Sequence, residues 1–415
     1  MHAAISLLVV VATLGLILTR PRGFAESWAA AGGAVAMVLA GVVGVSDLTA
    51  MMRELADVLL FLLGMMVVTS LAEAAGVFGR IAAWCLRLAR GSGWLLFSNI
   101  FLFGALVTIF LSLDVTVIVL TPIVFAFTTR QRLDALPFMF ACSFVANTAS
   151  LALPISNLTN LLVANQLKLG FGSFAAQMWL PTVAALAVNL GLFLWLFRHQ
   201  VPRRFEMIGP DTLAPADWWL LVAATVLGAT LLAIVGAGVA NRPLSWPALA
   251  GATVLLLVGL VSGRARARTI ASEVSWPLFL FVVGMFLVVR GFEQAWLEGV
   301  VVRLPDRPGT ALLVGVVGGT VGSNIVNNVP MTVLALTLLP RADEAAQAPL
   351  AYGTLIGANI GPMLTTYGSL ATMLWLTLVR KRGLDVSTRE YMKIGLITVP
   401  PVLVAATIAL WVTLP

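Results

Sequence analysis

Runs of apolar residues, separated by short polar segments, follow one another along the whole chain. Most are about 18–22 residues long, which is the length that a helix needs to cross a hydrocarbon core about 30 Å thick. The runs fall at 3–19, 25–45, 55–76, 94–128, 137–166, 176–197, 217–236, 244–262, 275–292, 310–340, 350–379 and 391–413. This pattern predicts an all-α polytopic membrane protein.

Four of the runs do not fit a single uninterrupted crossing. Residues 94–128 and 310–340 are too long for one helix, and we interpret each as a re-entrant hairpin that enters and leaves on the same side. Residues 137–166 and 350–379 are also long and are interrupted by Pro, Gly, Ser and Asn. These two runs predict helices that are broken inside the membrane.

The positions of the basic residues test this topology. With two hairpins, 18 of the 25 Lys and Arg residues fall on one face, which the positive-inside rule assigns to the cytoplasm. The prediction is ten crossings plus two hairpins in a bacterial-type inner membrane, with both termini outside. The first run is interpreted as a retained helix, because its basic residues Arg20 and Arg22 follow it as they would not in a signal peptide.

The order of the runs repeats in the two halves of the chain. We predict a first repeat at 1–197, a cytoplasmic linker at 198–216 and a second repeat at 217–415, with five crossings, one hairpin and one broken helix in each repeat. An offset of 212 residues pairs Asn147 with Asn359, and an offset of 214 pairs Asp114 with Asn328. An odd number of crossings inverts the second repeat relative to the first, an arrangement typical of transporters with a site at the midplane.

Composition excludes several other classes of protein. Sixty per cent of the residues are hydrophobic and only 10% are charged, so the formal net charge of +7 indicates loop orientation rather than nucleic-acid binding. The two cysteines, Cys85 and Cys142, and the two histidines, His2 and His199, predict no metal site, disulfide framework or cofactor. A membrane-embedded enzyme would need a Ser–His, His–Glu or two-acid site at membrane depth. The two histidines lie at loop edges and Asp114 is alone, so we do not expect an enzyme.

Short amide and hydroxyl side chains are concentrated at the breaks and at the hairpin turns. Such groups both donate and accept hydrogen bonds, and the N-termini of half-helices add partial positive charge, so together they suit a small neutral or anionic solute. The predicted substrate-binding residues are Asn147, Thr148, Ser150, Ser156, Asn157, Asn160, Asn324, Asn327, Asn328, Asn359, Thr365 and Ser369. The alternative is that these side chains only satisfy the interrupted backbone or bridge helices.

Asp114 lies at the predicted turn of the first hairpin, between Leu113 and Val115. A carboxylate in that position is costly unless it is protonated or paired, which makes Asp114 the proton-coupling candidate, with Asn328 as its uncharged counterpart. The alternative is a fixed acceptor for N–H groups at the hairpin turn. No Lys or Arg lies near a predicted break, so a multiply charged anion such as a dicarboxylate lacks a counter-charge.

Four motifs carry a resemblance to a known family. Residues Ser112–Val124, Ala149–Asn160, Asn327–Thr332 and Gly368–Leu376 resemble the ArsB arsenite/antimonite efflux permeases of the ion transporter superfamily, and the resemblance covers nearly the whole chain. It implies export of trivalent arsenic or antimony hydroxide in exchange for protons, and a soluble ATPase subunit as partner in some members. It assigns substrate contact to Asp114, Asn147, Ser156, Asn157, Asn160, Asn327, Asn328, Asn359 and Ser369.

The second broken helix departs from the family pattern. Many members carry a polar or charged residue at the position of Met363 and Pro at that of Thr366, and some carry Asp where this chain has Asn359. The resemblance still makes a proton-coupled arsenite/antimonite exporter the leading hypothesis. The alternative within the same superfamily is a sodium- or proton-coupled transporter of another small anion, since unwound carbonyl groups together with Asn and Thr can coordinate Na⁺.

Overall fold

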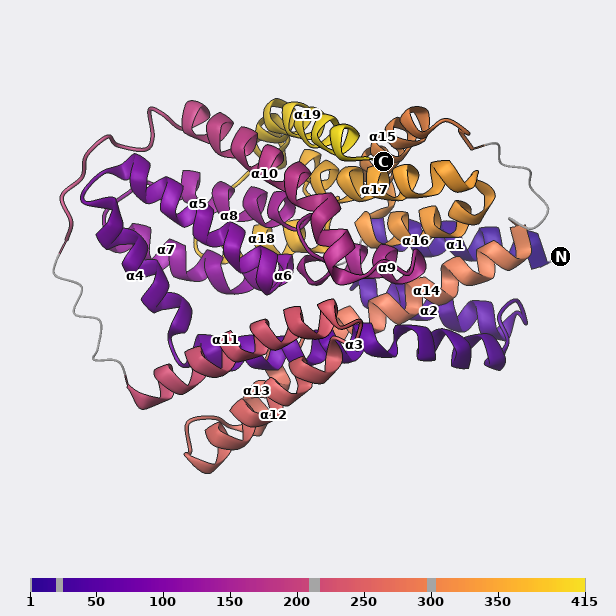
Figure 1. Cartoon of the computed structure of the whole chain (residues 1–415), viewed down its shortest axis with the longest axis horizontal. Coiled ribbons are helices and arrows are strands. Elements are labelled where there is room, and N and C mark those ends of the chain that lie inside the picture. Colours follow the sequence, from indigo (N-terminus) through magenta and orange to yellow (C-terminus); the bar gives the residue numbers. More distant parts are fainter. Residues whose placement is uncertain (1, 20–24, 209–216, 297–303, 415) are drawn as a thin grey trace.

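The computed structural model describes residues 2–19, 25–208, 217–296 and 304–414, and every regular element in these ranges is a helix (Figure 1). The first half contains α1 (His2–Thr19), α2 (Glu26–Leu39), α3 (Val45–Ala74), α4 (Val77–Ala89), α5 (Gly93–Phe110), α6 (Leu113–Val115), a π-helical stretch (Thr116–Leu120), α7 (Thr121–Arg130), α8 (Ala135–Ala149), a 3₁₀ turn (Pro154–Ser156), α9 (Leu158–Gln166) and α10 (Phe171–Leu196). The second half contains α11 (Trp218–Val239), α12 (Ser245–Val261), α13 (Ala267–Glu273), α14 (Trp276–Trp296), α15 (Pro308–Val326), α16 (Asn328–Leu338), 3₁₀ turns at Leu339–Arg341 and Gly361–Leu364, α17 (Glu344–Ile360), α18 (Leu370–Lys381) and α19 (Thr388–Thr413).

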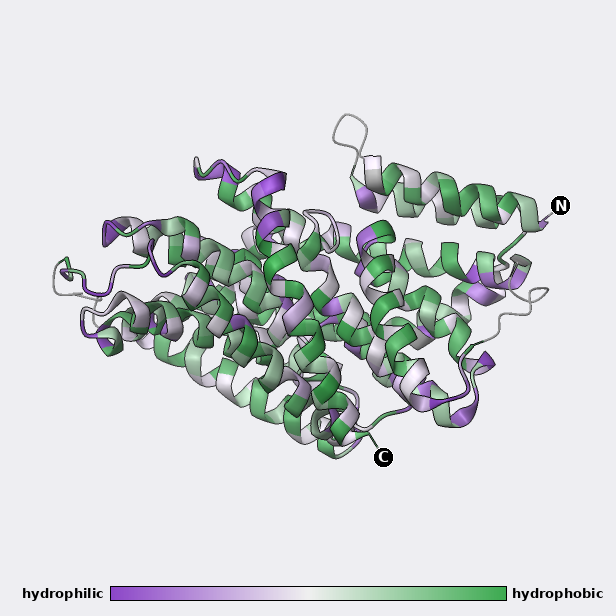
Figure 2. Ribbon diagram, turned by 90° about the horizontal axis from the view of Figure 1, so that it is seen from above, coloured by the Kyte–Doolittle hydropathy of each residue, from purple (hydrophilic) through white to green (hydrophobic). Residues whose placement is uncertain are grey.

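Apolar residues cover most of the length of these helices, and polar residues gather at their ends (Figure 2). Within the described residues, eight helices are long and apolar enough to cross a membrane, and α1, α2, α8 and α12 are shorter apolar helices. The chain is therefore an all-α, multi-pass membrane protein, as the hydropathy pattern predicted. The count of ten crossings and the position of the termini stay predictions.

The chain turns sharply inside both of the long apolar runs. Ser112, with φ of 139°, separates α5 from α6, and Asn327, with φ of 76°, separates α15 from α16. A positive φ is strained for a residue with a side chain, so surrounding contacts must hold both turns in place. In the first case α7 returns to pack against α4, the helix that precedes α5, which agrees with a hairpin.

Both predicted helix interruptions are present. The first lies between α8 and α9 at 150–157, and the second lies between α17 and α18 at 361–369. Each contains a single 3₁₀ turn that includes a proline, Pro154 or Pro362. Each proline lies in the first turn of its 3₁₀ segment, where its missing N–H donor is tolerated, and both breaks occur where the sequence pattern located them.

Three details of the sequence prediction need correction or fall outside the structure. Helix α3 begins at Val45, not at residue 55, so Arg53 lies in a helix and not in a loop. The early start is stabilised by Asp47, whose carboxylate accepts a hydrogen bond from the Gly44 N–H at 2.9 Å, and hydropathy cannot detect such a polar first turn. Helix α13 was not predicted. The sequence also predicts amphipathic segments at the membrane surface at 78–90 and 298–303. The first corresponds to α4, and the second lies outside the described residues.

Helices from the two halves pack against each other in reciprocal pairs: by their order along the chain, α2 corresponds to α12 and α3 to α14, and each contacts the equivalent of the other. Helix α2 packs along α14 and α3 packs along α12, while α10 and α19 pack together on the opposite side of the molecule (Figure 1). The hairpins and broken helices lie between these two groups. This central position buries the interruptions in protein, which is the condition under which irregular backbone is tolerated at membrane depth.

Candidate functional site

A small cavity of about 20 Å³ lies where the two hairpin turns meet the two helix interruptions. Each of these four elements contributes one polar residue to its wall: Asp114 of α6, Asn328 of α16, Asn157 before α9 and Ser369 before α18. The remaining lining residues are apolar, namely Leu113, Leu158, Leu278, Phe281, Val329, Leu370 and Ala371. Asp114 is the single ionisable residue in this lining.

Two helix N-termini point their first turns at this cavity. The side chain of Asn157 accepts a hydrogen bond from the Thr159 N–H at 3.3 Å, and the Ser369 hydroxyl accepts one from the Thr372 N–H at 3.1 Å. Each cap satisfies one backbone donor at the start of its helix. The partial positive charge at the N-termini of α9 and α18 therefore favours an oxygen-rich solute in the cavity.

The carboxylate of Asp114 has no hydrogen-bond or ion-pair partner among the residues that the structure describes. The Asn328 backbone N–H donates to the Gly368 carbonyl at 3.1 Å, which ties the second hairpin to the second break, while the amide side chain faces the cavity. A carboxylate and an amide thus lie on the cavity wall at equivalent places in the two hairpins. Among the described residues neither side chain has a hydrogen-bond partner, so both can bind a solute or, for Asp114, a proton.

Asn359 of α17 connects the second half of the chain to the first break. Its Oδ1 accepts hydrogen bonds from Asn157 Nδ2 at 2.9 Å and from Thr159 Oγ1 at 2.8 Å, and its Nδ2 donates to Asn160 Oδ1 at 2.8 Å. Asn160 in turn donates to the backbone carbonyls of Ser150 and Leu153. These bonds fix the entrance of α9 beside the cavity.

Asn147 of α8 makes the matching contact with the second break, and makes it more weakly. Its Oδ1 accepts one hydrogen bond from Ser369 Oγ at 3.4 Å, while its Nδ2 donates to the Ser143 carbonyl of its own helix at 2.9 Å. Ser150 donates to the Asn147 carbonyl. The two interruptions are therefore held by different numbers of bonds, with the first attached more firmly to the opposite half.

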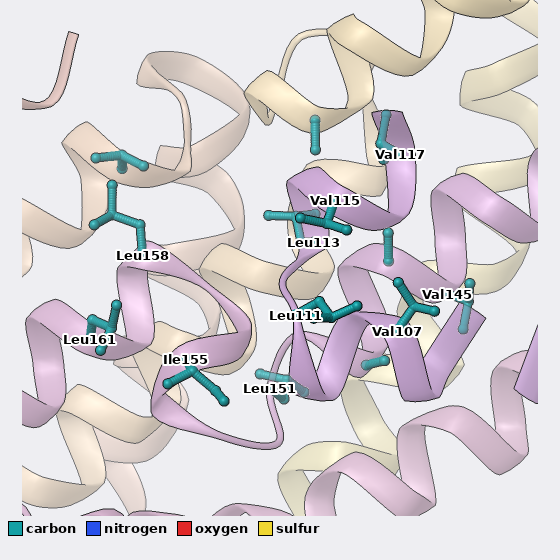
Figure 3. Packing of buried hydrophobic residues seen from close by; sticks show 14 of the residues in the cluster. Val107, Leu111, Leu113, Val115, Val117, Val145, Leu151, Ile155, Leu158 and Leu161 are labelled. Carbon is teal, nitrogen blue, oxygen red and sulfur yellow. The ribbon is translucent and has the colours of Figure 1, made fainter. Parts of the chain in front are cut away.

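The other predicted residues lie behind the cavity. Thr148 accepts a hydrogen bond from Asn189 at 2.7 Å on the α10 side of α8. Ser156 donates to the Ile109 carbonyl at 2.7 Å, near the end of α5. Figure 3 shows that Leu111 and Leu113 of the hairpin turn and Ile155 of the break belong to the buried apolar cluster here.

At the second break, Asn324 donates to the Gly361 carbonyl at 2.8 Å and accepts from Thr365 Oγ1 at 2.7 Å. Asn327 donates to the Tyr367 carbonyl at 3.4 Å. These contacts satisfy interrupted backbone, the alternative role considered for such residues. None of the three residues lines the cavity.

Sequence reasoning missed the apolar part of the site. Leu278 and Phe281 of α14 close one side of the cavity, and Tyr391 of α19 contacts Thr372 and Ser143 behind it. Apolar residues in an apolar helix carry no distinguishing signal, and only the packing of α14 on the hairpins identifies them. Within the described residues, no group of three His, Cys, Asp or Glu side chains could hold a metal ion.

Replacing Asn359 by alanine is expected to destabilise the protein by about 2 kcal/mol, because three buried partners would lose their hydrogen bonds. Thermal unfolding in detergent measures the effect. Asn165→Ala is the matched control, since this residue is an exposed asparagine on α9. Equal unfolding temperatures for the two variants would contradict the role of Asn359 as the connection between the halves.

Comparison with known proteins supports the resemblance found in the motifs. The chain is 29% identical over 425 residues to the arsenical pump membrane protein of Yersinia enterocolitica, with 96% of each chain covered. It is 29% identical over 423 residues, with the same coverage, to that of Escherichia coli K12. Both relatives match almost from end to end, so the resemblance to arsenical pump membrane proteins is confirmed.

The fold is also found among solved transporters. A crystal structure of the YdaH transporter of Alcanivorax borkumensis aligns with a TM-score of 0.55 at 16% identity and covers 89% of each chain. The family described as citrate transporter, CitMHS, matches residues 14–357. Because this match spans most of the sequence, the chain is a membrane transporter that belongs to the citrate transporter family, CitMHS, and is similar within it to the arsenical pump membrane proteins.

Proposed function

We propose that this chain is a secondary transporter that exports arsenite or antimonite from the cytoplasm in exchange for protons. The observation that carries the proposal is the cavity lined by Asn157, Asn328 and Ser369, with Asp114 as its single ionisable residue. The arsenical pump relatives support an arsenic oxyanion, or its neutral acid, as substrate.

The chemistry of the lining fits that substrate. Arsenous acid is neutral at pH 7 and has three hydroxyl groups, which asparagine and serine side chains can bind without a counter-ion. Asp114 would bind the exchanged proton. At about 20 Å³ the cavity holds roughly one water molecule, so it must widen before a solute enters. A site that is closed in this way is consistent with alternating access.

The proposal includes the inverted repeats at 1–197 and 217–415, joined by the linker at 198–216. Two observations support them. Packing is reciprocal, since α2 contacts α14 while α3 contacts α12. The bond between Asn359 and Asn157 is matched by the bond between Asn147 and Ser369. An offset of 212 residues relates each residue of one bond to its equivalent in the other, Asn147 to Asn359 and Asn157 to Ser369.

A second candidate is a sodium- or proton-coupled transporter of another small anion. The family description favours it, because citrate and related anions carry carboxylates that the N-termini of α9 and α18 could hold. The absence of Lys and Arg from the cavity lining disfavours an anion with several charges. Neither candidate requires a soluble ATPase subunit.

Arsenite accumulation in everted membrane vesicles tests the proposal. Vesicles that contain the chain are expected to accumulate arsenite when their interior is acidic, and to lose it when an uncoupler collapses the gradient. Vesicles without the chain are the control. If no accumulation occurs, arsenite export is excluded, and uptake of citrate or another small anion with a sodium gradient then tests the second candidate.

A further inference from the structure

Two further cavities extend from Asp114 toward a face that is rich in arginine. The first, of about 60 Å³, lies between α3 and the first hairpin and is lined by Ser112, Asp114, Glu73 and Glu273 among others. The second, of about 480 Å³, is lined by Glu73, Glu273, Arg264 and Arg266. Asp114 is shared by the substrate cavity and the first of these, and the two glutamates are shared by the first and the second. The three cavities therefore follow one another in space.

The face on which this series ends is the one that the positive-inside rule predicts to be cytoplasmic. The wide cavity is bounded by the loop between α12 and α13, which carries Arg264 and Arg266. Arg264 forms an ion pair with Asp217 at 2.7 Å, so its charge is already partly balanced at the protein surface. In this structure the proton-coupling candidate thus adjoins a series of cavities that leads to this face of the protein.

Glu73 of α3 and Glu273 of α13 lie where the cavity of about 60 Å³ meets the cavity of about 480 Å³. Neither carboxylate has a hydrogen bond or an ion pair with any residue that the structure describes. Charged groups that share a cavity with them are Asp114 from α6 and Arg264 and Arg266 from the loop. A structural glutamate at the end of a membrane helix would be expected to pair with a nearby arginine, and these two remain open to the cavities instead.

We propose that Glu73 and Glu273 form a proton relay between Asp114 and cytoplasmic water. This inference rests on the proposed function, in which protons move inward as substrate moves out. In the step itself, the O–H bond of the protonated Asp114 breaks and a glutamate carboxylate, directly or through one water molecule, takes the proton. The proton then passes to water in the wide cavity, so that Asp114 becomes a carboxylate and the glutamate returns to its charged state.

The relay joins residues that the sequence keeps apart. Glu73 is close to the end of α3, and Glu273 is the last residue of a short helix in the second half. The position of Glu73 near the end of an apolar run predicts, from sequence alone, contact with water or headgroups. Only the packing of α13 against α3 brings the second carboxyl group to the same cavity.

Transport by charge-neutral variants gives the first test. The double variant Glu73→Gln, Glu273→Gln is expected to lower proton-driven arsenite accumulation in everted vesicles at least about tenfold. Exchange of labelled for unlabelled arsenite without a gradient should continue, because it needs substrate binding but no net proton release. Glu293→Gln on α14 is the matched control, since Glu293 pairs with Arg290 and lies outside the series of cavities. Unchanged accumulation in the double variant would overturn the relay.

Access to water gives a second test that does not depend on the substrate. In a chain with Cys85 and Cys142 replaced by alanine, Glu73→Cys and Glu273→Cys are expected to react with a charged, membrane-impermeant thiol reagent in everted vesicles. They should not react in intact cells, where the reagent meets only the outer face. Protection of either cysteine in everted vesicles would overturn the proposed path. If the native chain moves no arsenite but labelling follows this pattern, the proposed substrate fails and the path stands.

Discussion

The Asp114→Asn variant is expected to insert into the membrane normally and to lose proton-driven arsenite accumulation by a factor on the order of 100. Asparagine has nearly the same shape as aspartate and keeps a hydrogen-bonding side chain on the cavity wall, but it cannot bind and release a proton. The substitution removes only the proton-binding group, because the Asp114 carboxylate has no hydrogen-bond or ion-pair partner among the described residues that the change would leave unpaired. Uptake into everted vesicles with an acidic interior measures the loss.

The control for Asp114 is Asp385→Asn, which removes an exposed carboxylate from the loop before α19. This variant should accumulate arsenite like the native chain. Exchange of labelled for unlabelled arsenite separates coupling from binding, and it should persist in Asp114→Asn. If accumulation in Asp114→Asn equals that of the native chain, Asp114 is a fixed acceptor for the hairpin turn and the exchanged proton binds elsewhere.

The features that the sequence predicted best are those in which polar residues interrupt an apolar run. Polar residues interrupt an apolar run at each of these places, namely the turns at Ser112 and Asn327 and the breaks near Pro154 and Pro362. Polar side chains and interrupted backbone are energetically costly at membrane depth, so they seldom occur there without a structural or functional cause. For the same reason Asp114 could be recognised as unusual from the sequence alone.

The features that could not be predicted depend on contacts between distant parts of the chain. Asn157 and Asn359 are 202 residues apart, and no local pattern shows that one donates to the other. The polar first turn of α3 is stabilised by Asp47, which a hydropathy average counts as a loop residue. Phe281 and Glu273 acquire their places beside the cavities only through helix packing, which sequence periodicity does not specify.

The crossing of α15 and α17 depends on four glycines, Gly315 and Gly319 on one helix and Gly353 and Gly357 on the other. Each of the four faces a backbone atom of the opposite helix: a Cβ at Gly319 would lie 2.6 Å from the Thr354 carbonyl oxygen. Glycines spaced four apart on both helices let the backbones approach closely, the usual basis of strong packing between membrane helices. This crossing sets the position of α17, and therefore of Asn359, beside the first break.

Replacing Gly357 by valine is accordingly expected to destabilise the protein by about 3 kcal/mol or more, because its Cβ would overlap the Val316 carbonyl oxygen and lie 2.6 Å from the Thr320 nitrogen. Neither is a flexible side chain that could move aside, so the helices must separate. The expected result is a large fall in the amount of monodisperse protein after extraction in detergent and in its unfolding temperature. Gly318→Ala is the matched control, since a Cβ there meets nothing within 4 Å and alanine favours the helix. If Gly357→Val unfolds at the same temperature as Gly318→Ala, the two helices do not approach each other as closely as this structure requires.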